Sequence, residues 1–128
     1  MELRVVRVTD QFDEACRFYG EVLGWPVTRE WDDDGRGRVF GYGDVGRVEL
    51  MEGTPSPVSG VFMSIETDDV VSLRDRLLVN GTPIVQPITD QPWGHRNIGI
   101  VDPTGITLVF FEILHAPPTA DDSSPQIP

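Results

Sequence analysis

The chain carries one pattern of predicted elements twice, and this repeat limits its possible folds more than any other feature. The first copy is a strand, a helix and three strands, at residues 3–9, 11–24, 26–31, 38–42 and 47–52. The second copy has the same order, at residues 61–66, 68–80, 83–86, 97–101 and 106–113. This repeated order predicts an α+β fold made of two βαβββ modules.

Both predicted helices have start and stop signals. The apolar residues of the first helix recur at three- and four-residue spacing: Phe12, Cys16, Tyr19 and Leu23. We expect Asp10 to cap this helix and Gly24 to end it, and we expect Asp68 and Asn80-Gly81 to do the same in the second helix. Each module is thus predicted to pack one helix against its own strands.

The length of 128 residues suits one domain with a substantial core. The modules at 1–53 and 61–115 are expected to form this domain together, joined by the Pro- and Gly-containing linker 54–60. Residues 116–128 have too little apolar side chain to offset the entropy of ordering them, so they predict a disordered tail.

Three segments stand out as motifs: FYGEVLGW at 18–25, GRVELMEG at 46–53 and DQPWGHRNIGIVDPTGITLVFFE at 90–112. In this order they resemble the vicinal oxygen chelate superfamily, which includes glyoxalases, fosfomycin-resistance enzymes, extradiol dioxygenases and bleomycin-resistance proteins. The resemblance implies that the two sheets form a curved half-barrel with a concave cleft. It leaves the function open, because the superfamily contains both metal enzymes and metal-free drug-binding proteins.

Strand alternation predicts which side chains face this cleft, because neighbours along a strand point to opposite faces. The predicted cleft-facing residues of the second module are Phe62, Ser64, Glu66, Trp93, His95, Asn97, Gly99, Thr107, Val109 and Phe111. Those of the first module are Leu3, Val5, Arg7, Arg47, Glu49 and Met51. A bulge near Gly94 would reverse the residues that precede it.

Metal-dependent members of the superfamily hold a divalent ion with His or Glu side chains from four strands. The resemblance places these positions at Leu3, Glu49, Phe62 and Val109. Only Glu49 carries a donor atom, and one carboxylate does not hold a catalytic metal against water. We therefore expect neither a metal ion nor another cofactor.

The side chains at these positions give the predicted cleft an apolar, aromatic floor edged by polar groups. Such a floor suits a small aromatic or polycyclic ligand, and Glu49 and Glu66 would meet a positive group on it. The predicted ligand-binding residues are Leu3, Arg7, Glu49, Phe62, Ser64, Trp93, His95, Asn97, Val109 and Phe111. The alternative for the apolar members is ordinary core filling at a vestigial site.

The segment PWGHRNIGIVDPTG at 92–105 resembles the metal-free bleomycin-resistance branch, in which a homodimer sequesters a drug in clefts between its subunits. The resemblance implies a homodimer that sequesters an aromatic natural product, including a cationic one, for antibiotic resistance or self-protection. Three aromatic residues of the first predicted hairpin are candidates for the mouth of the partner's cleft: Trp31, Phe40 and Tyr42.

A second function stays open: a lyase, isomerase or epimerase of glyoxalase type. In it Glu49 would be the general base, and Arg7 or His95 would stabilise developing negative charge. Glu49 also has a plainer role available, an ion pair with Arg7 or Arg47. A regulatory subunit that uses the cleft for assembly would leave no distinguishing residue.

The excess of acidic residues limits the classes of molecule that the protein is expected to bind. The sequence has 21 acidic and 10 basic residues, which argues against nucleic acid or an anionic membrane and favours a cationic ligand, although solubility alone also explains it. The single cysteine, Cys16, excludes an intrachain disulfide, and we expect it to be packed and inert. Charges near the start interrupt any signal peptide, and no apolar run reaches membrane-spanning length, so we expect a cytoplasmic protein.

Overall fold

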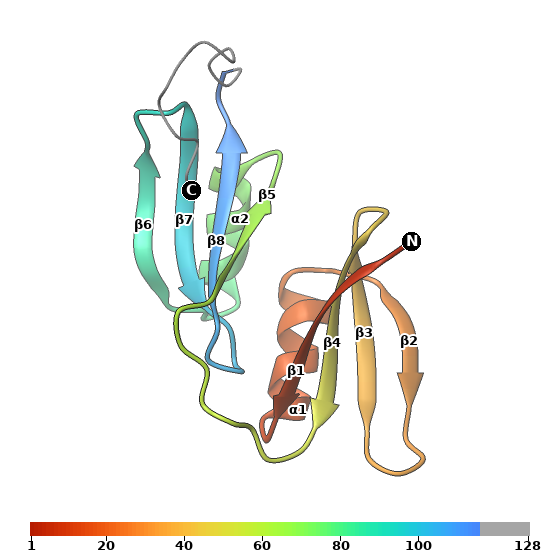
Figure 1. The fold of residues 1–128 in the computed structure, drawn as a ribbon. Helices are drawn as coiled ribbons and strands as arrows, with labels where there is room; N and C mark the ends of the chain where they lie inside the picture. The colour runs from red at the N-terminus through yellow and green to blue at the C-terminus, as the bar shows by residue number, and fades with distance from the viewer. Residues whose placement is uncertain (116–128) are drawn as a thin grey trace. The chain divides into compact units, whose positions relative to one another are not determined.

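The computed structural model describes residues 1–115, so the predicted disordered tail, 116–128, lies outside the described residues. Within them the chain follows the order β-α-β-β-β twice and builds two four-stranded mixed sheets (Figure 1). The predicted α+β class is confirmed. The cleft that the resemblance implies stays a prediction.

The first sheet has the strand order β1-β4-β3-β2, with β1 and β4 parallel and the other pairs antiparallel. Its elements are β1 (Leu3–Thr9), α1 (Phe12–Arg17), η1 (Phe18–Val22), β2 (Val27–Trp31), β3 (Gly37–Tyr42) and β4 (Gly46–Glu52). Because the chain leaves β1 through a helix and returns as a meander, β4 comes to lie beside β1 in the middle of the sheet.

The second sheet repeats this topology in the order β5-β8-β7-β6, with β5 and β8 parallel. Its elements are β5 (Phe62–Glu66), α2 (Val70–Val79), β6 (Ile84–Asp90), β7 (His95–Val101) and β8 (Thr107–Ile113). Strand β6 runs four residues beyond the predicted end at Gln86, with an irregular register against β7. Trp93 lies in the turn between these strands rather than in a strand.

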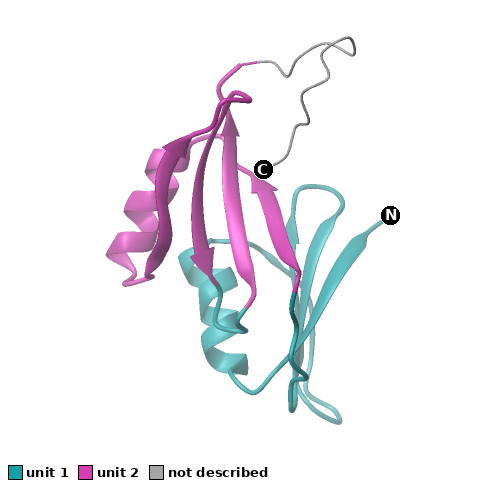
Figure 2. Ribbon diagram, turned by 60° about the vertical axis from the view of Figure 1, so that its left-hand side comes forward, with its two compact units in different colours: residues 1–59, 102–105 teal, residues 60–101, 106–128 magenta. Residues whose placement is uncertain are grey.

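The structure divides into two compact units (Figure 2). Unit 1 comprises Met1–Ser59 and Asp102–Gly105, and unit 2 comprises Gly60–Val101 and, among the described residues, 106–115. The turn between β7 and β8 thus belongs to unit 1. That the two modules act as one domain stays a prediction.

The first helical segment differs from the single regular helix predicted at 11–24. After Arg17 the backbone widens into the π-helical turn η1, and Gly24, with φ +74°, ends the segment as expected. The predicted cap at Asp10 is wrong, because the residue before the helix is Gln11. Its N–H is bound instead by the hydroxyl of Thr9, at 2.9 Å.

The second helix begins one residue later than predicted, at Val70, so its cap is Asp69 and not Asp68. The Asp69 carboxylate accepts from Ser72 N at 3.0 Å and from Ser72 Oγ at 2.8 Å. The end at Asn80 and Gly81 is confirmed. No helix in residues 1–115 is long and apolar enough to cross a membrane.

The core of unit 1 is aromatic. Tyr19 is fully buried, and its ring lies 5.1 Å from Phe18, 5.3 Å from Trp25 and 6.0 Å from Phe40, between ring centroids. Phe40 is only 1% exposed, so the expectation that it reaches a partner's cleft is wrong. Cys16 is buried as predicted, and burial raises the pKa of its thiol.

The core of unit 2 is mainly aliphatic and lies between α2 and one face of the sheet. Its largest buried residues are Leu77, Ile98, Ile100, Leu108 and Phe110. Because these residues alternate along β7 and β8, the other face of the sheet carries a second, different set of side chains.

Candidate functional site

This second face of the unit 2 sheet carries most of the predicted ligand-binding residues. The strand register places these side chains on it: Phe62, Ser64 and Glu66 of β5, His95, Asn97 and Gly99 of β7, and Thr107, Val109 and Phe111 of β8. We call this face, together with Trp93 of the preceding turn, the aromatic face. The predicted grouping of the strand residues is confirmed, whereas their contact with a ligand stays a prediction.

Three rings pack together where β7 begins. His95 stacks on Phe111 with ring centroids 4.7 Å and planes 12° apart, and Trp93 meets His95 edge-on at 6.4 Å. Trp93 Nε1 and His95 Nδ1 are shielded from solvent, and within residues 1–115 neither has a hydrogen-bond partner. Unsatisfied buried polar atoms are uncommon in folded proteins, so these two indicate a partner group that residues 1–115 do not supply.

A cluster of amide side chains lies beside the rings. Asn97 is only 2% exposed, and its Oδ1 accepts from Gln86 Nε2 at 2.8 Å and from Gln91 Nε2 at 3.2 Å. Gln86 lies against Gly99, where a Cβ would come within 3.0 Å of the Gln86 Cβ. The sequence predicted no role for Gln86 or Gln91; a glycine at position 99, between Ile98 and Ile100, was the signal for a close neighbour.

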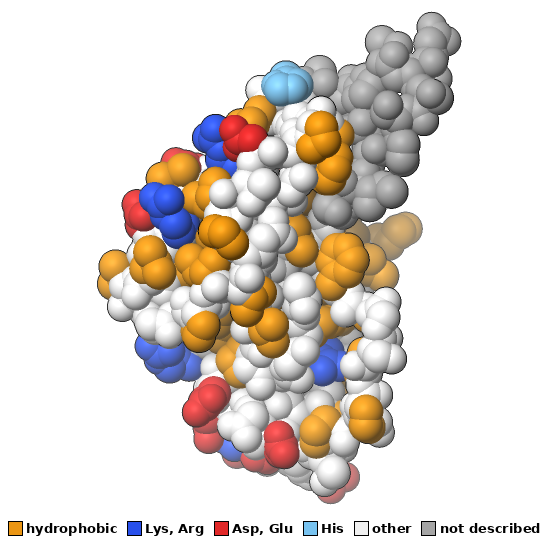
Figure 3. Space-filling view, turned by 90° about the vertical axis from the view of Figure 1, so that its left-hand side faces the viewer, with side chains coloured by type: hydrophobic (Ala, Val, Ile, Leu, Met, Phe, Trp, Pro, Cys, Tyr) orange, Lys and Arg blue, Asp and Glu red, His pale blue; other side chains and the backbone are white. Residues whose placement is uncertain are grey.

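An ion pair joins the end of β6 to the start of β7. Arg96 Nε donates to Asp90 Oδ1 at 2.7 Å, and this bond lowers the pKa of the Asp90 carboxyl. In Figure 3, which looks toward the side where β6 lies, basic and acidic side chains lie next to each other and hydrophobic ones are scattered among uncharged ones. Neighbouring charges on this surface therefore offset one another.

The sheet of unit 1 does not group the predicted residues as expected. Strand β1 pairs with β4 so that Val6 lies beside Glu49 and Arg7 lies beside the fully buried Leu50. Leu3 and Arg7 are therefore on the face opposite Glu49, and the expectation that they share a face with it is wrong. The alternation was ambiguous because valines occupy both faces of β1.

Arg7 holds a turn rather than facing a cleft. Its guanidinium donates to Thr104 Oγ1 at 3.1 Å and to the Thr104 carbonyl at 3.0 Å. The same turn is held by Tyr19, whose hydroxyl donates to Asp102 Oδ2 at 2.5 Å. Burial, and then the charge of Asp102, raise the pKa of the Tyr19 hydroxyl well above its ordinary value.

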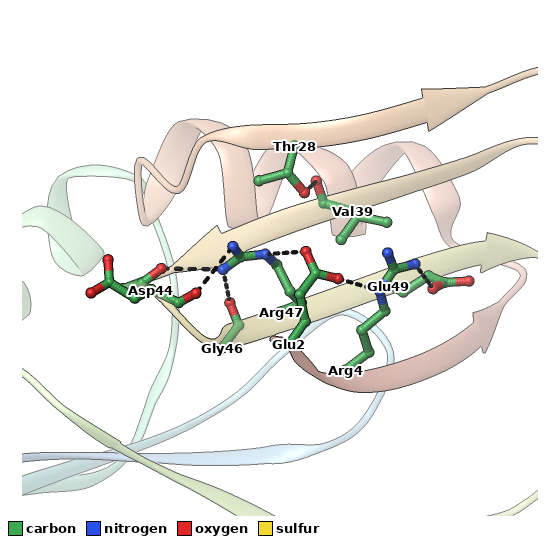
Figure 4. A network of polar contacts seen from close by, with 9 residues as sticks. Glu2, Arg4, Thr28, Val39, Asp44, Gly46, Arg47 and Glu49 are labelled. Atoms are coloured by element: carbon green, nitrogen blue, oxygen red, sulfur yellow. Dashed lines mark hydrogen bonds and ion pairs between the residues drawn. The ribbon is translucent and has the colours of Figure 1, made fainter.

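Glu49 belongs to a network of ion pairs on the other face of this sheet (Figure 4). Its Oε1 accepts from Arg4 Nη1 at 2.8 Å, Arg4 Nε donates to Glu2 at 2.9 Å, and Arg47 Nε donates to Glu2 at 3.0 Å. The partner of Glu49 is thus Arg4, and the predicted pairing with Arg7 or Arg47 is wrong. The bonds from Arg4 and then Arg47 lower the pKa of the Glu2 carboxyl.

The donor set does not fit a metal ion within either unit. Of the four positions that the resemblance assigns to metal ligands, only Glu49 carries a donor, and Arg4 occupies one of its oxygens. Among residues 1–115, no group of three or more His, Cys, Asp or Glu side chains lies close enough together to hold a metal.

Two hollows in unit 1 share Glu30 and Trp31 in their walls, and their volumes are about 480 and 410 Å³. Trp31 lies directly over Gly37, where a Cβ would overlap the indole, and the Arg29 guanidinium lies 5.7 Å from the ring centroid on Trp31. Charged side chains make up much of both walls. The predicted role of Trp31 at a partner's cleft stays a prediction.

A family model described as the Glyoxalase/Bleomycin resistance protein/Dioxygenase superfamily matches residues 3–110. The chain belongs to this superfamily, and the resemblance noted in the sequence is confirmed. Among the curated proteins, none matches the chain.

Solved structures with this fold include proteins of different kinds. TioX from Micromonospora sp. ML1 is 24% identical, with a TM-score of 0.72 over 89% of this chain and 99% of that one. TnmS3, an antibiotic binding protein from Streptomyces sp. CB03234, is 21% identical, with a TM-score of 0.73 over 88% and 95%. Lactoylglutathione lyase from Agrobacterium tumefaciens is 19% identical, with a TM-score of 0.69 over 88% and 92%. At these identities the likeness concerns the fold alone.

Proposed function

We propose that this protein binds a small aromatic natural product on the aromatic face of unit 2, without a metal ion, and protects the cell by sequestering it. The observation that carries the proposal is the stack of His95 on Phe111 beside Trp93, with two shielded nitrogen atoms that lack a hydrogen-bond partner among the described residues. Stacked rings favour a flat ligand, and unmet polar atoms favour one that also forms hydrogen bonds.

The exposure of Phe62 supports the same conclusion. Phe62 is 49% exposed on the aromatic face, beside Ser64 and Thr107, although a Phe in a core position would be buried. An antibiotic binding protein among the proteins of similar fold is in keeping with a natural product as the ligand. Protection by sequestration needs tight binding and no reaction, which this mainly aromatic and aliphatic surface suits.

The same proposal includes a cytoplasmic homodimer, as the resemblance to the bleomycin-resistance branch implies. A second copy would enlarge the surface available to a ligand, since one chain of 128 residues offers limited area for enclosing a polycycle. Tyr42, which packs on Trp25 at 4.7 Å but stays partly exposed, and Trp31 are then the candidate residues for contact with the partner's ligand.

The enzymatic alternative has less support from the geometry. A general base needs a carboxylate within reach of the substrate proton, but one oxygen of Glu49 is bound by Arg4. Arg7, proposed to stabilise negative charge beside it, lies on the opposite face and donates to Thr104. His95 lies in unit 2, stacked on Phe111.

A calorimetric titration tests the proposed function. Chelator-treated protein is titrated with bleomycin-like and polycyclic aromatic antibiotics, and at least one should bind with a measurable dissociation constant. Trp93→Ala should weaken that binding by roughly 2 kcal/mol or more, as expected for a central aromatic anchor. Leu78→Ala, which removes an exposed apolar side chain of α2, is the matched control and should bind like the unmodified protein. Absence of binding across the panel would refute the proposal.

A further inference from the structure

The aromatic face carries little charge. Within residues 1–115 its one carboxylate is Glu66, the last residue of β5, and this residue takes part in a contact of its own. The nearest acidic residues on neighbouring positions are engaged as well: Asp90 binds Arg96, and Glu112 accepts from the Val70 backbone N–H at 3.0 Å. The face therefore offers a cationic ligand one carboxylate, that of Glu66, among the described residues.

The other predicted acceptor of a positive group is also neutralised. Glu49, whose side chain is only 14% exposed, pairs with Arg4 at 2.8 Å. Removing this carboxylate from Arg4 to bind a ligand cation would replace one ion pair with another, and would leave the guanidinium without one of its two acidic partners. Among the predicted acceptors of a positive group, Glu49 is thus already paired, and Glu66 alone is left for a ligand cation.

The hydrogen-bonding capacity of the aromatic face points to a different ligand. An indole Nε1–H can only donate, so the complement to Trp93 is an acceptor atom. The neighbouring polar groups are also uncharged: the Gln86 and Asn97 amides and the Ser64 hydroxyl. Among the described residues Trp93 Nε1 has no acceptor, and an acceptor on the ligand would supply what the fold leaves unmet.

Trp93 lies in the turn between β6 and β7, outside the strands. It is the third residue of the four-residue turn closed by the Gly94 N–H to Gln91 carbonyl bond, at 3.1 Å, and it belongs to no strand. Its indole meets His95 edge-on, with ring centroids 6.4 Å apart, beside the strands of the sheet. His95, held by the β7 backbone and by stacking on Phe111, stays in place as the surface on which a ligand ring packs.

We infer that the ligand of the aromatic face is an uncharged aromatic compound with a hydrogen-bond acceptor in or beside its ring system, and that Trp93 Nε1 is the donor that selects it. This inference rests on the proposed function and specifies its ligand class. It replaces a cationic ligand with a neutral one, because Trp93 Nε1 can only donate, whereas His95 Nδ1, the other unmet atom, donates or accepts according to its tautomer.

Three probes with the same two fused rings separate these ligand classes at neutral pH. Naphthalene has the rings alone, quinoline adds one uncharged ring-nitrogen acceptor, and N-methylquinolinium blocks that nitrogen and adds a positive charge. Two-dimensional NMR of the ¹⁵N-labelled full chain gives a dissociation constant for each probe. The same spectra report on the indole N–H of Trp93, with the indole signals of Trp25 and Trp31 as internal references.

Quinoline should bind roughly fivefold more tightly than naphthalene, the value of one net hydrogen bond, and should shift the Trp93 indole N–H signal. Trp93→Phe keeps an aromatic ring but removes the donor, so it should bring the two dissociation constants together while naphthalene binding is retained. Backbone amide spectra that match those of the unmodified protein establish that this variant folds. His95→Phe is the comparison variant, and it should leave part of the preference for quinoline intact.

The other results are each decisive. Equal binding of naphthalene and quinoline would overturn the inference about Trp93 and leave the proposed function standing. Tightest binding of N-methylquinolinium would overturn it in favour of a cationic ligand. Failure of all three probes to bind would contradict aromatic recognition by this face, and with it the proposed function.

Discussion

Tyr19 and Asp102 illustrate how single residues fix this structure. Both side chains are buried, and the Tyr19 hydroxyl donates to a carboxylate oxygen whose neighbour accepts from Thr104 N and Oγ1 at 2.8 and 2.7 Å. A buried carboxylate is tolerated because each of its oxygens is bound. The turn Asp102–Gly105 thus depends on a residue 83 positions earlier in the chain.

Removing that donor should be costly. We expect Tyr19→Phe to lower the free energy of unfolding by about 1–3 kcal/mol, because it leaves the Asp102 carboxylate without its buried donor. Urea unfolding followed by circular dichroism measures the change. Within an Asp102→Asn background, which places a neutral amide there, the same substitution should cost less. An unchanged midpoint in the single variant would mean that the hydrogen bond contributes nothing.

The sequence predicted individual residues unevenly. Phe62, His95, Asn97, Val109 and Phe111 were placed on the correct face because β5 and β8 alternate between more and less buried positions, and the register ties β7 to β8. The side chains of the first strand were assigned to the wrong face because apolar residues occupy both of its faces. The spacing of apolar residues therefore does not indicate which face is buried. Arg4 was missed for the same reason.

At the scale of elements, Gly37 and Trp31 determine how the first hairpin closes. The indole lies over the glycine, where no Cβ fits. Gly37→Ala should destabilise the protein by roughly 1–3 kcal/mol, because the ring must move out of its place on β3. In a Trp31→Ala background the overlap is gone, and Gly37→Ala should be nearly neutral by thermal unfolding. Equal effects in both backgrounds would show that the contact does not matter.

The cap of α2 gives a prediction about acid stability. Bonds from the backbone and then the side chain of Ser72 lower the pKa of Asp69, so this group stabilises the fold above its ordinary pKa of about 4 and loses that effect as the pH falls through the lowered value. Asp69→Ala should therefore reduce the urea midpoint at neutral pH but much less at strongly acidic pH.

Asp68→Ala is the control for this prediction, since Asp68 does not cap the helix. Asp69→Asn keeps an acceptor and should retain most of the neutral-pH stability while weakening its dependence on acid. A deficit in Asp69→Ala that stays constant across the acid range would contradict a role for the ionised carboxylate.

Element types and their order followed from the sequence, while their ends did not. Every strand and both helical segments were predicted, but the caps fell one residue away at Gln11 and Asp69, because adjacent polar residues offer equivalent capping groups. The sequence gives no signal for the π-helical turn at Phe18–Val22, since Phe18, Tyr19 and Val22 are compatible with an α-helix as well as a π-helix. The β6 extension was missed because Pro87 interrupts its strand pattern.

The whole molecule is strongly acidic, at a formal net charge of −11, yet most of its arginines are held in ion pairs. The net negative charge therefore makes two copies of this chain repel each other. Surfaces with little charge are where a ligand or a partner can still bind. On this scale sequence motifs predicted the superfamily, because three segments in the correct order cover both units. They did not predict the ligand, because the superfamily fold accommodates several functions.

The proposed homodimer is tested by the mass of the protein in solution. Sedimentation equilibrium should give twice the mass of one chain at micromolar concentration, and added salt should strengthen the dimer by screening the repulsion between two acidic copies. A mass of one chain at every concentration and salt level would exclude the dimer, and binding would then belong to the single chain.

The central claim is that an aromatic ligand binds without a metal ion, and one comparison tests it most directly. The dissociation constant of quinoline, or of the tightest antibiotic found, is measured for chelator-treated protein and again after addition of zinc, nickel, manganese or iron. The account predicts the same value in every case. Binding that appears only after a metal is added, or conversion of the ligand to a product, would contradict it.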